Sequence, residues 1–190
     1  MIFWIVKIIT FIPLCIFCPT KIVGKKNLPK GKFILVCNHK SNIDYIYLFT
    51  RIWKKQYVLA KKSVFKKGFI SWLFKACGGI PVDRDNVEID TIKSCLKVLK
   101  NNNILTIFPE GTRNKTNSDL LEFKAGASIF AVRANAPVVP IFITKKPKLF
   151  CINKIIIGEP IFFDNSYKGQ DGTNKANNEI REKMLQLKSK

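Results

Sequence analysis

The chain has 190 residues, of which 47% are hydrophobic and 12% aromatic, and this composition excludes a protein that is disordered along its whole length. Charged residues make up 24%, and only one long apolar stretch is present, which excludes a protein with several membrane spans. The 33 lysines and arginines outnumber the 13 acidic residues and give a formal charge of +20, so nucleic acids, anionic membrane surfaces and phosphorylated substrates are the expected partners.

The long apolar stretch occupies residues 1–18, in which Lys7 and Thr10 are the polar positions. A helix of this length measures about 27 Å against a hydrocarbon core of about 30 Å, and Pro13 would kink it. A signal peptide is disfavoured because no basic residue precedes the apolar region and no small-residue cleavage site follows it. The lysines of the segment Lys21–Lys26 favour the cytoplasmic side. We predict that residues 1–20 are a membrane-associating helix that anchors the chain at the cytoplasmic face of the membrane. A buried core helix is the alternative.

Further along, short apolar runs alternate with helical patterns. Strands are predicted at 32–37, 57–60, 80–83, 104–108, 138–144 and 154–158, and helices at 44–53, 64–77, 87–100, 123–135 and 175–187. The stretch 169–178 is interpreted as a polar loop. This alternation predicts a single α/β domain over residues 21–190, with a largely parallel mixed sheet flanked by helices.

The six cysteines include the pair Cys15 and Cys18 in a C-x-x-C pattern, which is typical of redox or zinc sites. The pair lies inside the apolar stretch, however, and no second Cys or His pair follows at ligand spacing. We therefore predict free, buried thiols and no metal site.

The first chemical motif is Asn38-His39-x4-Asp44, which contains the only histidine of the chain. If His39 ends a loop after a strand and Asp44 lies in the first turn of a helix, the carboxylate can meet the imidazole, fix its tautomer and strengthen it as a base. Ser41-x-x-Asp44 also matches a capping box, in which Asp44 only caps the helix. The spacing leaves both interpretations open.

Three further blocks follow. The block Phe108–Arg113 comes directly after the strongest strand, and ligands bind at the carboxyl ends of parallel strands. Its Gly111 permits close approach to the backbone, and its Arg113 carries a planar fork suited to phosphate, although a surface turn would have the same sequence. The block Gly78–Arg84 also ends in arginine, and its Asp83 and Arg84 could equally form a surface ion pair. In the block Val139–Ile141, a proline within a strand indicates a sheet edge or a bulge.

These four ordered blocks resemble the glycerolipid acyltransferase family, and in particular the bacterial 1-acyl-sn-glycerol-3-phosphate acyltransferases, over about residues 20–160. One departure is Asn114, where the family commonly has serine. The resemblance implies acyl transfer from a thioester of acyl-carrier protein or coenzyme A to the 2-hydroxyl of lysophosphatidic acid, which gives phosphatidic acid for phospholipid biosynthesis.

The resemblance also implies the roles of individual residues. His39 would be the general base and Asp44 the residue that orients it. Arg84, Glu110, Gly111, Thr112 and Arg113 would hold the glycerol phosphate, and Lys61 or amides near Gly79 would stabilise the tetrahedral intermediate. No metal or tightly bound cofactor is implied.

The paired lysines at 54–55, 61–62 and 66–67 interleave with aromatic residues. This pattern indicates a face for an anionic bilayer or an acidic carrier protein, or else a solvated surface. Another acceptor, such as glycerol 3-phosphate or another lysolipid, would need the same motifs. A nucleic-acid-binding module would explain the charge but not the motifs, so we predict no nucleic-acid partner. An inactive membrane-bound scaffold is disfavoured by the presence of His39 and Asp44.

Overall fold

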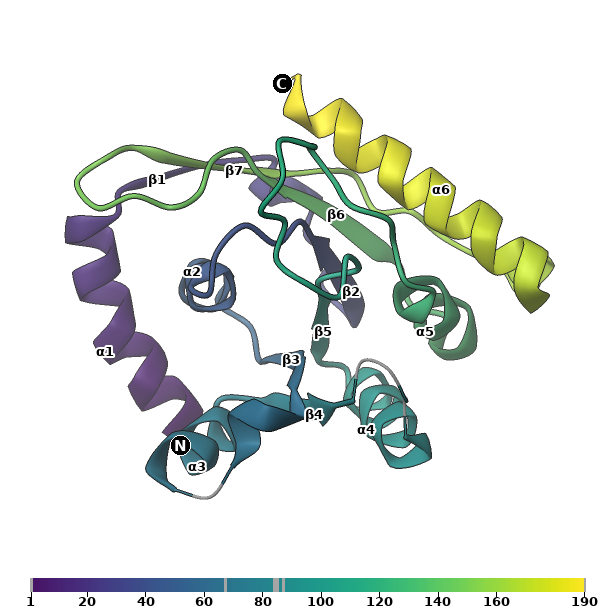
Figure 1. The fold of residues 1–190 in the computed structure, drawn as a ribbon, viewed down its shortest axis with the longest axis horizontal. Helices are drawn as coiled ribbons and strands as arrows, with labels where there is room; N and C mark the ends of the chain where they lie inside the picture. Colours follow the sequence, from purple (N-terminus) through teal and green to yellow (C-terminus); the bar gives the residue numbers. More distant parts are fainter. Residues whose placement is uncertain (1, 67, 84–85, 87, 190) are drawn as a thin grey trace.

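The computed structural model describes residues 2–66, 68–83, 86 and 88–189, and within them one mixed sheet of seven strands forms the centre of the molecule (Figure 1). The strand order is β1-β7-β6-β2-β5-β3-β4. The five strands from β6 to β4 are mutually parallel, whereas β7 pairs antiparallel with β6 and parallel with β1. The predicted α/β domain with a largely parallel mixed sheet is confirmed. The strands are β1 (Thr20–Val23), β2 (Phe33–Cys37), β3 (Gln56–Lys61), β4 (Gly79–Val82), β5 (Ile104–Ile107), β6 (Val138–Ile143) and β7 (Asn153–Ile157).

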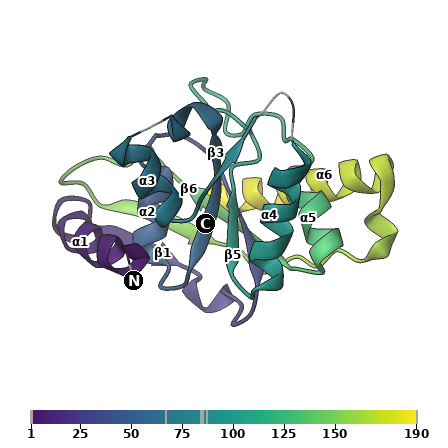
Figure 2. The ribbon, with the colours of Figure 1, turned by 90° about the horizontal axis from the view of Figure 1, so that it is seen from below.

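Helices cover both faces of this sheet, with α1, α2 and α3 on one side and α4, α5 and α6 on the other (Figures 1 and 2). Side chains alternate along each strand, so that Ile34 and Val36 of β2 join the core under α4, α5 and α6, whereas Phe33 and Leu35 join the core under α2. Because both faces are covered, β2 is buried along its whole length. The helices are α1 (Ile2–Phe17), α2 (Asp44–Arg51), α3 (Phe69–Ala76), α4 (Ile89–Lys100), α5 (Gly126–Ala134) and α6 (Gly169–Lys188).

Two predicted segments differ from the structure. The helix expected over 64–77 is divided into a 3-10 turn at Lys62–Phe65 and α3, because Gly68 between them has φ +122°, which is incompatible with a helix. The polar loop expected at 169–178 is wrong, since these residues form the first half of α6. Thr173, Ala176 and Asn177 continue its buried face toward Ile180, but small and polar residues give no apolar stripe that a sequence pattern could detect.

The strand β1 was not predicted, and of the two interpretations of Pro140 one is correct. The basic segment after the apolar stretch contains β1, an edge strand with an exposed Lys21, and lysine on an edge strand discourages unwanted pairing. Pro140 does not mark an edge, because β6 lies inside the sheet between β7 and β2, but it does lie at a bulge. Between the pairs Ile141↔Ile157 and Val138↔Ile161, three residues that follow β7 oppose two residues of β6. Its ring is tolerated because Pro140 lies beyond the last paired residue of β7. Its carbonyl still accepts a hydrogen bond from the Gly158 amide at 2.8 Å.

The N-terminal helix α1 packs on α2 and turns a row of isoleucines to the outside, so the alternative of a buried core helix is wrong. Ile9, Ile12 and Ile16 are 64%, 57% and 64% exposed. In the described part of the chain, no helix combines the length and the apolar character that are needed to cross a membrane. Cys15 and Cys18 are free thiols as predicted, but of these two only Cys18 is buried; Cys15 is partly buried, and Cys151 is exposed.

Two cations fasten α1 to α2. The ammonium of Lys7 is fully buried, donates to the carbonyl oxygens of Ile52 at 2.6 Å and Lys54 at 3.3 Å, and lies 5.0 Å from the centre of the Phe49 ring. In the other direction, Arg51 of α2 donates to the carbonyl oxygens of Leu14 at 2.8 Å and Cys18 at 2.9 Å, which caps the end of α1. The apolar helix is therefore an integral part of the packed structure.

The burial of Lys7 makes stability depend on pH in a specific way. Burial lowers the pKa of Lys7 from its ordinary 10.5 to about 8. Between these values the unfolded chain binds more protons than the folded chain, so the Lys7 contribution to stability increases as the pH rises through this window. We expect the free energy of unfolding of the wild type to rise relative to Lys7→Met between pH 8 and 10, by up to about 1.4 kcal/mol per pH unit.

Urea unfolding in mild detergent at several pH values would measure this difference. Lys115→Met, which removes an exposed lysine, is the control and should follow the wild type. Parallel curves for the wild type and Lys7→Met would contradict the assignment.

Candidate active site

The predicted site residues that the structure describes lie at the carboxyl edge of neighbouring parallel strands. His39 follows β2, the block Phe108–Arg113 follows β5, Lys61 ends β3 and Asp83 follows β4. These strands are adjacent in the order β2-β5-β3-β4, so their carboxyl ends open on one side of the molecule. Segments that are far apart in the sequence are thus assembled by strand order alone.

The centre of the site is the contact between His39 and Asp44. Nδ1 of His39 lies 2.9 Å from Oδ2 of Asp44, and the same oxygen accepts hydrogen bonds from the amides of Lys40 and Ser41 at 2.7 Å each. Asp44 is fully buried, whereas the His39 side chain is 14% exposed. The carboxylate holds Nδ1 and leaves Nε2 as the nitrogen that can take a proton.

Asp44 contacts the His39 imidazole, as the first interpretation of the sequence expected, and it also forms part of the capping box that the second interpretation expected. Asp44 accepts from the Ser41 amide, which is one half of a capping box, but the residue that precedes the helix is Ile43 and no side-chain cap is formed there. The first helical turn brings the carboxylate back to the loop, where one oxygen serves both the backbone and the imidazole.

His39 is also held from its other sides. Its ring stacks on Phe108, with the ring centres 4.3 Å apart and the planes inclined by 27°. Its amide donates to Oε1 of Glu110 at 2.9 Å, and its carbonyl accepts from the Asn114 amide at 2.8 Å. His39 is thereby held by both loops, through its ring and through its backbone.

Glu110 joins the loops that follow β2 and β5. Its second oxygen accepts from the Leu121 amide at 3.0 Å, and the side chain is 4% exposed. Both carboxylate oxygens are directed at backbone amides of this chain. The resemblance implied direct binding of glycerol phosphate, but an anionic group with both oxygens occupied is suited to positioning His39.

Asn38 and Cys37 complete the support beneath His39. The Asn38 side chain pairs with the backbone of Ile143, accepting at 2.7 Å and donating at 3.0 Å, which joins the loop to the end of β6. Burial, followed by the negative charges of Asp44 and Glu110, raises the pKa of the Cys37 thiol well above its ordinary value. Since the thiolate is the reactive form, Cys37 is not suited to act as a nucleophile.

A hollow of about 400 Å³ opens beside this assembly. Gly111 has φ +64°, and a Cβ at this position would come within 3.1 Å of the Lys124 side chain, so the aliphatic part of Lys124 crosses Gly111. Sequence reasoning missed Lys124, because only the fold brings it to the block that follows β5. The lining residues are Lys61, Lys62, Ser63, Val82, Asp83, Glu110, Gly111, Thr112 and Lys124.

Of the predicted arginines, the described one, Arg113, is not part of this lining. Arg113 is exposed directly after Thr112, and Arg84 lies outside the described residues. Lys61, Glu110, Gly111 and Thr112 are brought together around the hollow, next to the pair of His39 and Asp44.

A second hollow, of about 140 Å³, is apolar and lies among α1, α2 and α3. Its wall includes Tyr45, which directly follows Asp44 in the chain, and Val6 of α1. The lining residues are Val6, Thr10, Tyr45, Ile46, Phe49, Leu73, Phe74 and Cys77.

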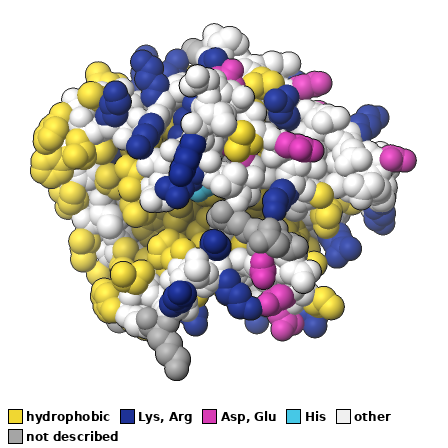
Figure 3. Space-filling model, in the orientation of Figure 1, with side chains coloured by type: hydrophobic (Ala, Val, Ile, Leu, Met, Phe, Trp, Pro, Cys, Tyr) yellow, Lys and Arg dark blue, Asp and Glu magenta, His cyan; other side chains and the backbone are white. Residues whose placement is uncertain are grey.

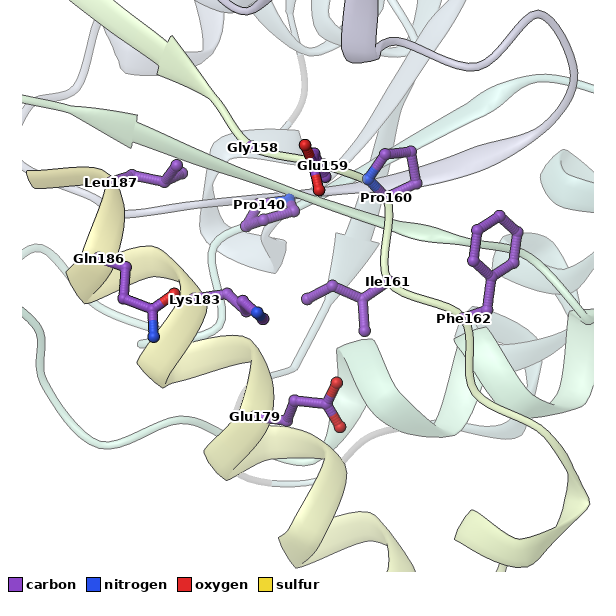
Figure 4. A pocket seen from close by; sticks show the side chains of 10 residues that line it. All are labelled: Pro140, Gly158, Glu159, Pro160, Ile161, Phe162, Glu179, Lys183, Gln186 and Leu187. Atoms are coloured by element: carbon purple, nitrogen blue, oxygen red, sulfur yellow. The ribbon is translucent and has the colours of Figure 1, made fainter. Parts of the chain in front are cut away.

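The hollow of about 470 Å³ in Figure 4 contains none of the predicted site residues. Glu179, Lys183 and Gln186 of α6 line one side, and Gly158 to Phe162 line the other. Because β7 is antiparallel to β6, Gly158 lies at the amino edge of the parallel strands. This hollow is therefore at the opposite end of the sheet from His39.

Comparison with known proteins finds several relatives. The family model described as "Acyltransferase" matches residues 19–144. The 1-acyl-sn-glycerol-3-phosphate acyltransferase of Saccharomyces cerevisiae is 33% identical over 179 residues, covering 87% of this chain and 58% of the yeast protein. The Bacillus subtilis protein of the same name is 36% identical over 152 residues, covering 74% of this chain and 73% of that protein. This chain therefore spans little more than half the length of the yeast relative.

Among solved structures, the 1-acyl-sn-glycerophosphate (LPA) acyltransferase from Thermotoga maritima superposes with a TM-score of 0.73 and 23% identity. The match covers 99% of this chain and 80% of that one. At this level of identity the likeness establishes a shared fold.

Proposed function

The chain belongs to the acyltransferase family, and from this premise we propose that it transfers a fatty acyl group from an acyl thioester to the 2-hydroxyl of 1-acyl-sn-glycerol 3-phosphate, giving phosphatidic acid. The observation that carries the proposal is the contact of 2.9 Å between His39 and the buried Asp44 at the carboxyl edge of the sheet. The relatives named 1-acyl-sn-glycerol-3-phosphate acyltransferases support this choice of acceptor.

In the proposed reaction, Nε2 of His39 takes the proton of the acceptor hydroxyl while the oxygen attacks the thioester carbonyl. Asp44 stays ionised and stabilises the imidazolium that forms. The tetrahedral intermediate then breaks its carbon–sulfur bond, and the leaving thiolate receives the proton from Nε2. The products are an ester and a free thiol, and no covalent intermediate on the protein is required.

The hollow that contains Lys61 and Thr112 supports binding of the acceptor phosphate. Its lining includes Lys61, Lys124, Thr112 and Gly111, and cationic side chains with hydrogen-bond donors suit a phosphate. We assign Arg113 and Arg84 to the same ligand by the resemblance, Lys61 to the phosphate or the developing oxyanion, and Glu110 to the positioning of His39.

The apolar hollow among α1, α2 and α3 suits part of a fatty acyl chain, because apolar side chains dominate its wall and one of them, Tyr45, directly follows Asp44 in the chain. The exposed isoleucines of α1 support association with the cytoplasmic face of the cell membrane, where both lipid substrates would be available. Acyl-carrier protein and coenzyme A remain the two proposed donors, and the reaction as written uses no metal or tightly bound cofactor.

An activity measurement in detergent tests the proposal. Purified protein would be given lysophosphatidic acid with a long-chain acyl-coenzyme A in one tube and with acyl-carrier-protein thioester in another, and both free thiol and phosphatidic acid would be followed. Product that requires His39 is expected from at least one donor. If lysophosphatidic acid gives no product with either donor but glycerol 3-phosphate or another lysolipid does, the proposed acceptor is wrong and that compound takes its place.

Arg113→Ala is expected to raise the KM for the phosphorylated acceptor by about tenfold or more while kcat changes little, because a charged hydrogen bond to phosphate is lost in the ground state and the transition state alike. Steady-state kinetics with varied acceptor measure both constants. Arg133→Ala, which removes an exposed arginine of α5, is the matched control. A fall in kcat at unchanged KM would instead confine the role of Arg113 to the transition state.

A further inference from the structure

The loop between β6 and β7 ends in a group of large apolar side chains that point away from the protein. Leu149, Phe150 and Ile152 are 63%, 75% and 80% exposed. We call residues 149–152 the apolar tip. Single exposed apolar residues are common on protein surfaces, whereas a contiguous group indicates a surface that meets an apolar partner.

The conformation of the apolar tip is fixed by polar contacts at its base. Asn153 is buried, and its side chain accepts from the Lys148 amide at 3.0 Å and donates to the carbonyl oxygens of Lys148 at 3.1 Å and Cys151 at 2.9 Å. Phe150 has φ +57°, a left-handed conformation that is rare for an aromatic residue. A strained backbone held in place by its surroundings is typical of functional segments, and here it keeps an aromatic ring in solvent.

The apolar tip also continues the exposed face of α1. The Phe150 amide donates to the Phe17 carbonyl at 2.6 Å, and the two rings meet edge to face with their centres 5.6 Å apart. In Figure 1 the loop lies at one end of α1, and in Figure 3 hydrophobic side chains gather on this same side of the molecule. Exposed lysines at 145, 146 and 148 lie next to the tip along the chain.

The position of the loop relates it to the active site. The loop begins after Ile143, whose backbone is paired with the Asn38 side chain directly before His39. The tip therefore projects from the carboxyl edge of the sheet, where a lipid acceptor would have to arrive.

We propose that the apolar tip is a second membrane-inserting element, which enters the acyl region of an anionic bilayer beside α1 while the adjacent lysines contact lipid phosphates. The inference rests on the proposed function. Two points of insertion would hold the carboxyl edge of the sheet at one orientation to the membrane, which matters if the active site takes its substrates from the bilayer.

Cys151 provides a reporter within the tip, because it is exposed while Cys18, Cys37 and Cys95 are buried. A thiol-reactive, polarity-sensitive fluorophore would be attached there, with Cys151→Ser as the labelling control. On vesicles of phosphatidylcholine with phosphatidylglycerol we expect a blue-shifted, brighter emission that is quenched by spin labels on the acyl chains. If the protein sediments with the vesicles but the fluorophore on Cys151 emits as it does in water, the inference is overturned and α1 is left as the membrane contact.

Substitution tests the same point without a label. The double variant Phe150→Asn with Ile152→Ser, in which asparagine tolerates the left-handed backbone, is expected to lower partition to these vesicles by about tenfold or more. Phe162→Ser is the matched control, since Phe162 is 74% exposed but follows Ile161, which pairs with the opposite end of β6. Equal partition of the wild type and the double variant would overturn the inference.

Acyl transfer to detergent-dispersed acceptor, measured on the same proteins, separates this inference from the proposed function. If the wild type and the double variant turn over equally in detergent, and only the variant loses turnover on vesicles, the result supports both the membrane role of the tip and the proposed function. If the tip inserts into vesicles but the protein shows no acyl transfer, the result supports the inference about the tip and rejects the proposed function.

Discussion

Replacing His39 by alanine is expected to abolish acyl transfer while the fold persists. An alcohol is a weak nucleophile at neutral pH, and a positioned general base contributes about 10²–10⁴-fold to the rate. His39 is the only histidine of the chain, so no second imidazole can replace it. The backbone contacts of His39 with Glu110 and Asn114 do not need the ring, and the loops should therefore keep their arrangement.

Thiol release and phosphatidic acid formation measure the loss, and circular dichroism with thermal unfolding checks the fold. Phe108→Leu is a useful companion, because it removes the ring that stacks on the imidazole and leaves the base itself, so it should reduce the rate only in part. Activity of His39→Ala close to that of the wild type would refute the assignment of the base.

Asp44→Asn is expected to lower kcat by about 10²–10⁴-fold with little loss of stability. The asparagine oxygen can still accept from the amides of Lys40 and Ser41, which Oδ2 serves in the wild type. The neutral side chain cannot stabilise an imidazolium, however, and the orienting charge beside Nδ1 is lost. In contrast, Asp44→Ala removes the acceptor from two backbone amides and should cost about 2–4 kcal/mol of stability as well.

The two variants together separate the catalytic and structural interpretations of Asp44. Kinetics and urea unfolding would be measured on both proteins. If Asp44 only organised the loop, Asp44→Asn would remain active while Asp44→Ala unfolded more readily, and the role in orienting the base would be withdrawn.

The parallel strands were predictable because burial on both faces leaves a direct trace in the sequence. Every side chain of β2 is buried, and the sequence from Phe33 to Cys37 is correspondingly an unbroken apolar run. The first half of α6 left no such trace, because Thr173 and Asn177 contribute polar side chains to its buried face. The edge strand β1 was missed for the related reason that its backbone pairing, and not its side chains, defines it.

For the site, the approach of His39 to Asp44 could be anticipated because both residues lie on one short segment. The resemblance extended this to the block Phe108–Arg113, and strand order explains why the two are neighbours. The contact of Glu110 with the Leu121 amide and the crossing of Gly111 by Lys124 were not predictable. Both depend on how the loop after β5 folds back, and no local pattern encodes that path.

The fastening of α1 to α2 has an evolutionary consequence. Lys7 and Arg51 bind main-chain carbonyl oxygens of Ile52, Lys54, Leu14 and Cys18, and every residue type supplies such an oxygen. These hydrogen bonds therefore place no requirement on the side chains of the four receiving residues, although Cys18 and Ile52 are constrained by their burial in the core, and the attachment depends on the two cations. A substitution at either cation would therefore loosen α1 from the domain without changing any residue in contact with His39.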